Sequence, residues 1–195
     1  MTTRPSLRIL VAVAAFALAG CRAEPPHLSG VQFSPPEPAP ALRLTDVEGK
    51  VFELAAQRGR VVLLYFGYTH CPDICPTTLS DWAKARAALG AAGEKVQLVF
   101  VSVDPERDTP GVSAAYVKQF SASIVGLTAS AADLDTIKKD WGFAVMKEET
   151  GSPAGYGVSH PGQTYVVDAQ GLGREVLPPG TPPATIASDL KALIP

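Results

Sequence analysis

The chain has 195 residues, a length that suits one domain with an additional segment. Its formal net charge is −2, its pI is about 5.9, and no stretch forms a basic stripe, so the composition gives no support to nucleic-acid binding. The mean hydropathy of +0.13 is inflated by an apolar N-terminus.

The N-terminus has the pattern of an export signal. Arg4 and Arg8 provide positive charge, and residues 9–19 form an apolar run. Because a membrane-spanning helix needs about 20 residues, we expect a signal peptide over residues 1–20 and no membrane span. The run ends in LAGC at Cys21, which resembles the lipobox of bacterial lipoproteins and implies a lipidated Cys21 that anchors the chain without spanning. An ordinary signal peptide with a coincidental cysteine is the alternative.

The following segment, residues 21–41, is rich in proline and has little periodic apolar content. We expect it to be an extended, mobile tether that holds a domain of residues 42–195 away from the membrane. If Cys21 carries lipid, Cys71 and Cys75 are the remaining cysteines. Thiols outside the cytoplasm tend to be oxidised, so this pair is a disulfide, a redox couple or a metal site.

Strand patterns alternate with helix patterns along the domain. Short apolar segments at 42–45 and 51–54 flank a turn and predict a hairpin. Continuous apolar runs at 60–66 and 96–103 predict two strands that are buried on both faces. The remaining predicted elements are helices over 74–89, 109–120, 130–141 and 183–194, and strands over 143–146, 164–167 and 174–177. The order predicts an α/β fold, a thioredoxin-like domain with an N-terminal hairpin extension.

The two cysteines follow the first buried strand, in the stretch GYTHCPDICP at residues 67–76. A strand, a short loop and a helix would place Cys71 near the helix N-terminus and Cys75 about one turn later. The helix dipole and the unpaired amide groups there lower the pKa of a thiol. The spacing permits a disulfide, and it also suits two thiolates on one Cu(I) or zinc ion, which normally requires a third donor. The cysteine loop alone leaves a redox pair, a structural disulfide and a metal site open.

Three histidines are candidates for that third donor. His70 is adjacent to Cys71, and neighbouring side chains point in different directions, so we interpret His70 as packing in the loop or as a residue around the ligands rather than a ligand. His27 lies in the predicted tether. His160 directly precedes the strand predicted at 164–167, and in thioredoxin-like folds the loop before this strand faces the cysteine loop. We therefore expect His160 to complete a site with the two cysteines.

Three blocks of the sequence resemble the SCO/SenC family of copper-binding, thioredoxin-like proteins. The blocks are GYTHCPDICP at 67–76, VSVDPERDTP at 101–110, and His160 followed by TYVVD at 164–168 and Gly171. They occur in the order of the family, and the resemblance covers about residues 42–195. The third block departs from the family at one position, since the family usually has serine where this chain has Pro161.

The resemblance implies that Cys71, Cys75 and His160 bind one copper ion, as Cu(I), Cu(II) or both. It implies a copper metallochaperone that supports assembly of the copper centre of cytochrome c oxidase, by delivering copper, by reducing the cysteines of the oxidase, or both. The implied partners are the copper-centre subunit of the oxidase, another periplasmic copper chaperone or thiol reductase, and the membrane through the lipid anchor, with no nucleic acid. The expected location is the periplasmic side of a bacterial cell envelope.

Two aspartates are candidates for hydrogen bonds around the ligands. Asp73 lies between the cysteines, and Asp104 follows the second buried strand, where a turn with Arg107 pairing locally is the simpler interpretation. The competing function is a metal-independent thiol–disulfide oxidoreductase or peroxide reductase, in which Cys71 and Cys75 are catalytic. A structural disulfide is the third reading, although so small a loop would stabilise the fold little.

Overall fold

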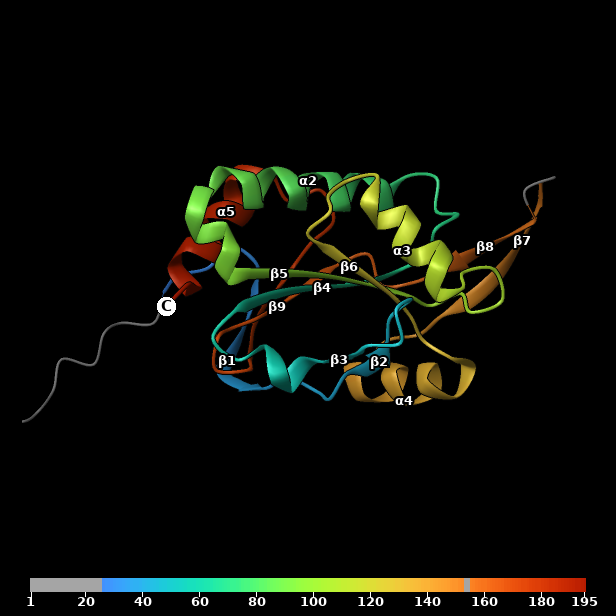
Figure 1. The fold of residues 1–195 in the computed structure, drawn as a ribbon, viewed down its shortest axis with the longest axis horizontal. Coiled ribbons are helices and arrows are strands. Elements are labelled where there is room, and N and C mark those ends of the chain that lie inside the picture. Colours follow the sequence, from blue (N-terminus) through green and yellow to red (C-terminus); the bar gives the residue numbers. More distant parts are fainter. Residues whose placement is uncertain (1–25, 153–154) are drawn as a thin grey trace, which may run out of the picture.

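The structure is a computed structural model that describes residues 26–152 and 155–195. The predicted signal peptide and Cys21 lie outside the described residues. The centre of the fold is a six-stranded sheet of order β1-β10-β9-β4-β5-β6. Helices α2, α3 and α5 cover one face, and α4 with the β2–β3 hairpin lies on the other (Figure 1).

The sheet consists of β1 (Val31–Pro38), β4 (Val61–Gly67), β5 (Val96–Ser102), β6 (Ile124–Thr128), β9 (Thr164–Val167) and β10 (Leu172–Leu177). Two hairpins stand apart from it, β2 (Arg43–Thr45) with β3 (Val51–Glu53), and β7 (Met146–Ser152) with β8 (Gly155–Ser159). The helices are α2 (Ile74–Ala88), α3 (Pro110–Lys118), α4 (Ala131–Trp141) and α5 (Pro183–Leu193), with short 3₁₀ turns η1 (Leu54–Gln57) and η2 (Gly90–Lys95). In the described part of the chain, no helix is both long and apolar enough to cross a bilayer.

The core is built on β4 and β5, which run parallel and pair Val61 with Val96 through Gly67 with Ser102. Every residue of β4 is buried, because elements cover both faces of the sheet. Both strands predicted from continuous apolar runs are confirmed, as are the hairpin at 42–54 and the α/β class.

The sequence missed β6, which pairs in parallel with β5. Its five residues, IVGLT, include a glycine that lowers strand propensity. The structure requires that glycine, because a Cβ at Gly126 would lie 2.6 Å from the carbonyl oxygen of Ser113 in α3. Packing of β6 against α3 thus requires a glycine, and this glycine weakens the strand pattern in the sequence.

The strand predicted at 143–146 was also wrong in position. Residues 143–145 are not in a strand, and β7 begins at Met146. The polar sequence MKEETGS and the glycine-rich GYGVS show no alternation of apolar residues, so neither predicted a strand. The two strands pair with each other and project beyond the sheet at one end (Figure 1).

The described part of the predicted tether is not separate from the domain. β1 pairs antiparallel with β10 at the edge of the sheet, from Val31 opposite Val176 to Pro38 opposite Leu172. Leu28 is only 1% exposed. Edge strands tolerate proline, because one side of the strand needs no hydrogen-bond donor. The packed domain thus begins well before residue 42.

Candidate metal centre

Cys71, Cys75 and His160 come together at one end of the sheet. One ligand atom from each lies within 4.8 Å of the others. His160 Nε2 is 3.6 Å from Cys75 Sγ, although 85 residues separate them in the chain. Both cysteines are free thiols. The structure therefore unites the three side chains that sequence reasoning selected as ligands.

The cysteines are positioned by the end of β4 and the start of α2. A Cβ at Gly67 would lie 2.7 Å from Cys75 Sγ and 2.8 Å from a ring carbon of Tyr65, so only glycine lets the strand pass this close. α2 begins at Ile74, which places Cys75 in its first turn and leaves Cys71 in the preceding loop. The two sulfurs meet across the loop–helix junction rather than along one face of a helix.

His160 directly follows β8, and its ring is held from both ends. Nδ1 lies 2.9 Å from the carbonyl oxygen of Phe66 and 3.0 Å from that of Pro161. Carbonyl oxygens only accept hydrogen bonds, so Nδ1 carries the proton and Nε2 presents its lone pair toward Cys75. Pro161, where the chain departs from the family, thus helps to orient the histidine.

Two tyrosines enclose the imidazole edge-on. The ring centroids of Tyr65 and Tyr68 lie 5.9 Å and 5.5 Å from that of His160, with interplanar angles of 88° and 76°. Both tyrosines are buried and belong to β4 and the residue after it. Sequence reasoning gave neither a role, although Tyr68 lies in the same block of residues as the cysteines.

The pKa values of the two thiols are shifted in opposite directions. A hydrogen bond from Cys75 lowers the pKa of Cys71, and the backbone amides of Asp73 and Cys75 lower it further, against the effect of burial. Burial, and then the hydrogen bond to Cys71, raise the pKa of Cys75. The pair therefore holds one proton on Cys75, with the thiolate on the half-buried Cys71.

This donor set fits a soft metal ion. Two thiolates and an imidazole are ligands that copper and zinc accept, whereas calcium and magnesium prefer oxygen. Cys75 is fully buried, while Cys71 and His160 are partly exposed. An ion would be reached from the side of Cys71 and His160, and its binding would displace the proton of Cys75.

The other candidate residues lie around this cluster rather than in it. Asp73 is exposed at the N-cap position of α2, and its side chain makes no capping hydrogen bond. The buried carboxylate of Asp104 binds Arg107 and Tyr156. His70 is exposed, and its Nδ1 lies 3.6 Å from Asp108. Sequence reasoning missed Asp108 and Tyr156, although Asp108 stands in the second block of the resemblance.

Comparison with known proteins identifies close structural relatives. The SCO1/SenC family profile matches residues 34–195. The apo Sco1 structure from Thermus thermophilus is 36% identical with a TM-score of 0.76, covering 86% of this chain and 97% of that one. The copper-bound ScoI from Bradyrhizobium japonicum is 32% identical with a TM-score of 0.72, covering 80% and 99%. These neighbours confirm the thioredoxin-like fold.

Two further relatives are a lipoprotein of known structure and a curated protein sequence. A SCO1/SenC family lipoprotein from Bacillus anthracis is 27% identical with a TM-score of 0.69, covering 82% of this chain and 98% of that one. A curated protein from Stutzerimonas stutzeri is 37% identical over 133 residues, which are 68% of this chain and 65% of that protein. The match thus spans slightly less than two thirds of this curated relative.

Proposed function

The chain belongs to the SCO1/SenC family, and we propose that it carries one copper ion bound through Cys71, Cys75 and His160. The observation behind this proposal is the convergence of two sulfurs and one imidazole nitrogen within 4.8 Å. Two thiolates favour Cu(I), and the imidazole provides the third donor that a pair of cysteines lacks. Copper is the cargo of this site, taken up and passed on.

The residues are prepared for uptake in different ways. The thiolate of Cys71 is half-exposed and offers the first contact to incoming copper. Cys75 completes the pair once it loses its proton. Nε2 of His160 needs no rearrangement, because the carbonyl oxygen of Phe66 already holds Nδ1–H. Since Cys71 and His160 remain partly exposed, ligands of a recipient protein can approach from the same side.

We further propose that the recipient is the copper-centre subunit of cytochrome c oxidase, reached from the periplasmic side of a bacterial membrane. A lipidated Cys21 would anchor the chain there. The family resemblance supports the client, and the LAGC pattern with the lipoprotein from Bacillus anthracis supports the anchor. A second copper chaperone or a thiol reductase would reload or reduce the site.

Reduction of a partner disulfide is a second use of the same thiols. The lowered pKa of Cys71 and the adjacent Cys75 favour it. The Cys71 thiolate attacks a partner disulfide, forms a mixed disulfide and releases one partner thiolate. Cys75 passes its proton to His160 and attacks the Cys71 sulfur, releasing the second partner thiolate. The partner gains two electrons, and this chain is left with a Cys71–Cys75 disulfide.

Anaerobic copper titration of the full chain tests the ligand set. All proteins carry Cys21→Ser, so that Cys71 and Cys75 are the only thiols. We expect one Cu(I) per chain in competition with a chromogenic chelator. Cys71→Ser, Cys75→Ser and His160→Ala should each weaken binding by at least tenfold. His70→Ala is the matched control, because His70 adjoins Cys71 but lies outside the cluster.

Two results would overturn the proposal. Equal Cu(I) and Cu(II) affinity in His160→Ala and the parent would remove the third ligand. Disulfide or peroxide turnover that persists with a copper chelator and in His160→Ala would instead favour a metal-independent oxidoreductase.

A further inference from the structure

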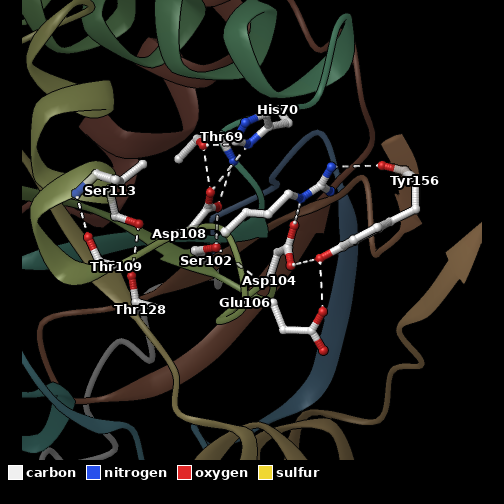
Figure 2. Close-up of polar contacts among 12 residues, drawn as sticks. Thr69, His70, Ser102, Asp104, Glu106, Asp108, Thr109, Ser113, Thr128 and Tyr156 are labelled. Atoms are coloured by element: carbon white, nitrogen blue, oxygen red, sulfur yellow. Dashed lines mark hydrogen bonds and ion pairs between the residues drawn. The ribbon is translucent and has the colours of Figure 1, made fainter. Parts of the chain in front are cut away.

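One loop, residues 104–108, contacts both the cysteine loop and the β7–β8 hairpin that leads to His160. β5 pairs in parallel with β4, so the segments after Ser102 and Gly67 leave the sheet at the same edge. Val103 N–H donates to the carbonyl oxygen of Gly67 at 2.8 Å. The cysteine loop follows Gly67, and Figure 2 shows Thr69 and His70 of that loop beside Asp108, and Tyr156 of β8 beside Asp104 and Glu106.

On the cysteine side, the loop binds through Asp108. This carboxylate is fully buried and accepts hydrogen bonds from Thr69 N at 2.8 Å, Thr69 Oγ1 at 2.6 Å and Ser102 Oγ at 2.5 Å. Thr69 stands two residues before Cys71. Hydrogen bonds to a buried carboxylate are among the stronger ones in proteins. The start of the cysteine loop is therefore tied to residues 104–108.

Residues 104–108 also contact Tyr156 of β8, the strand that precedes His160. The tyrosine O–H donates to Asp104 Oδ1 at 2.7 Å and lies 3.3 Å from Glu106 Oε2, and its carbonyl oxygen accepts from Arg107 Nη1 at 2.9 Å. The Arg107 guanidinium carbon lies 3.7 Å from the centroid of the tyrosine ring. Arg107 Nε donates to Asp104 at 2.6 Å, which orients the guanidinium. Tyr156 precedes His160 by four residues.

These contacts exceed what a turn or a helix cap requires. Thr109 supplies the cap of α3, because its Oγ1 accepts from Val112 N at 3.2 Å. Besides the local pair of Arg107 with Asp104, the carboxylates of Asp104 and Asp108 and the guanidinium of Arg107 also contact other segments. The hairpin that they hold is a two-stranded sheet, which alone is marginally stable. Apart from the buried Val158, β8 is exposed or half-buried.

We propose that Arg107 and Tyr156 are positioning residues for the metal site. Residues 104–108 form a spacer that ties the cysteine loop through Asp108 and the histidine hairpin through Tyr156. The spacer thereby sets the distance between the two sulfurs and His160 Nε2. This inference rests on the proposed copper site, and it assigns to the second sequence block a role that turn chemistry does not explain.

A double-mutant cycle in the full chain with Cys21→Ser tests the spacer. Tyr156→Leu keeps bulk but removes the O–H and the aromatic ring. We expect it to weaken Cu(I) binding about tenfold, the lower end for residues that orient metal ligands. Tyr156→Phe should weaken binding less, because the ring stays under Arg107. In the His160→Ala background, Tyr156→Leu should have no further effect. Glu149→Ala, at an exposed hairpin residue, is the control.

Amide hydrogen exchange in the copper-free protein provides a readout independent of metal. Tyr156→Leu should speed exchange at residues 156–160, while amides of β4 and β5 keep the parent rates. Arg107→Gln removes the other partner of the same contact and should also speed exchange at residues 156–160.

Three outcomes would overturn the spacer. The first is Tyr156→Leu binding copper as tightly as the parent while His160→Ala binds weakly. The second is equal weakening by Tyr156→Leu with and without His160. The third is unchanged exchange at residues 156–160. If His160→Ala itself binds like the parent, the ligand assignment fails and exchange alone decides on the spacer.

Discussion

The two cysteines differ in exposure and in charge, and this asymmetry determines their chemistry. Cys71 is half-buried and carries the negative charge of the pair, while Cys75 is fully buried and holds the proton. A thiolate is both the nucleophile and the metal ligand. In the proposed function, Cys71 would therefore meet copper or a partner disulfide first, and Cys75 would complete the metal site or resolve the mixed disulfide.

Alkylation of the reduced, copper-free protein tests this asymmetry. Because the pKa of Cys71 lies below its usual range, iodoacetamide should modify Cys71 at pH 6 while Cys75 stays unmodified in the folded chain. Cys75→Ala removes the largest cause of the lowered pKa, so the rate at Cys71 should fall by about tenfold or more at pH 6. Peptide mass spectrometry gives both rates. Equal modification of the two cysteines would contradict the assignment.

Glu175 is a second residue whose environment sets its protonation. The side chain is fully buried, its Oε2 accepts from Gly30 N at 2.7 Å, and Oε1 has no hydrogen-bond partner. Burial, with a smaller contribution from the charge of Asp189, raises the pKa of Glu175 from 4.5 to about 7 against the opposing effects of Gly30 N–H and Arg174. The folded chain therefore binds more protons than the unfolded chain between these two pH values.

Protonation of Glu175 makes the stability of the folded chain depend on pH. The free energy of unfolding should fall as pH rises from about 4.5 to 7, by roughly 2 kcal/mol from this group. Glu175→Gln keeps an acceptor for Gly30 N and cannot ionise. We expect the variant to match the parent near pH 4.5 and to exceed it in stability at pH 8. Urea unfolding across this range measures the difference, and a constant difference would refute the assignment.

At the scale of elements, the segment before residue 42 contributes to the fold. Leu28 is buried, β1 extends the sheet beyond β10, and Asp189 of α5 accepts from both Ser29 N and Ser29 Oγ. These contacts fasten the N-terminal segment along the edge of the domain. Any tether to a lipid anchor is therefore shorter than the proline content indicates.

Removing this segment should cost stability but leave the metal site intact. We expect a chain of residues 42–195 to unfold about 3 kcal/mol more easily than one of residues 26–195, because it loses the burial of Leu28 and the hydrogen bonds of β1. Copper affinity should change less than threefold, since β1 contributes no ligand. Urea unfolding of both chains measures the difference. Identical unfolding curves would show that the segment is independent.

At the scale of the whole molecule, the central sheet positions the two cysteines and the β7–β8 hairpin positions His160. β4 is buried along its length and carries the cysteine loop at its end. The projecting hairpin (Figure 1) leads into His160, whose Nε2 lies 3.6 Å from Cys75 Sγ, and residues 104–108 contact both the cysteine loop and the hairpin (Figure 2). Two of the proposed ligands thus follow a fully buried strand and the third follows a separate hairpin, so binding and release of the proposed copper ion would not need to disturb the core.

The sequence predicts the elements that depend on neighbouring residues better than those that depend on contacts between segments distant in the chain. The apolar runs that form β4 and β5 are local signals, and the structure confirms both strands. The helices predicted to begin at 109 and 130 are confirmed as well, and Thr109 and Ser130 cap them. β6 and β7–β8 lack such signals, because a close helix contact at Gly126 shapes the first and pairing between polar strands forms the others. Their existence depends on neighbours distant in the chain.

The sequence by itself determined the chemistry of the site. It supplied two thiols at a spacing that allows a disulfide or a metal, a histidine before a predicted strand, and the blocks that resemble a copper-binding family. Only the tertiary structure decided which thiol holds the proton, which nitrogen of His160 faces the sulfurs, and how Tyr156 and Asp108 connect the two halves. Residue types are written in the chain, whereas burial and hydrogen-bond partners arise only when segments 85 residues apart pack together.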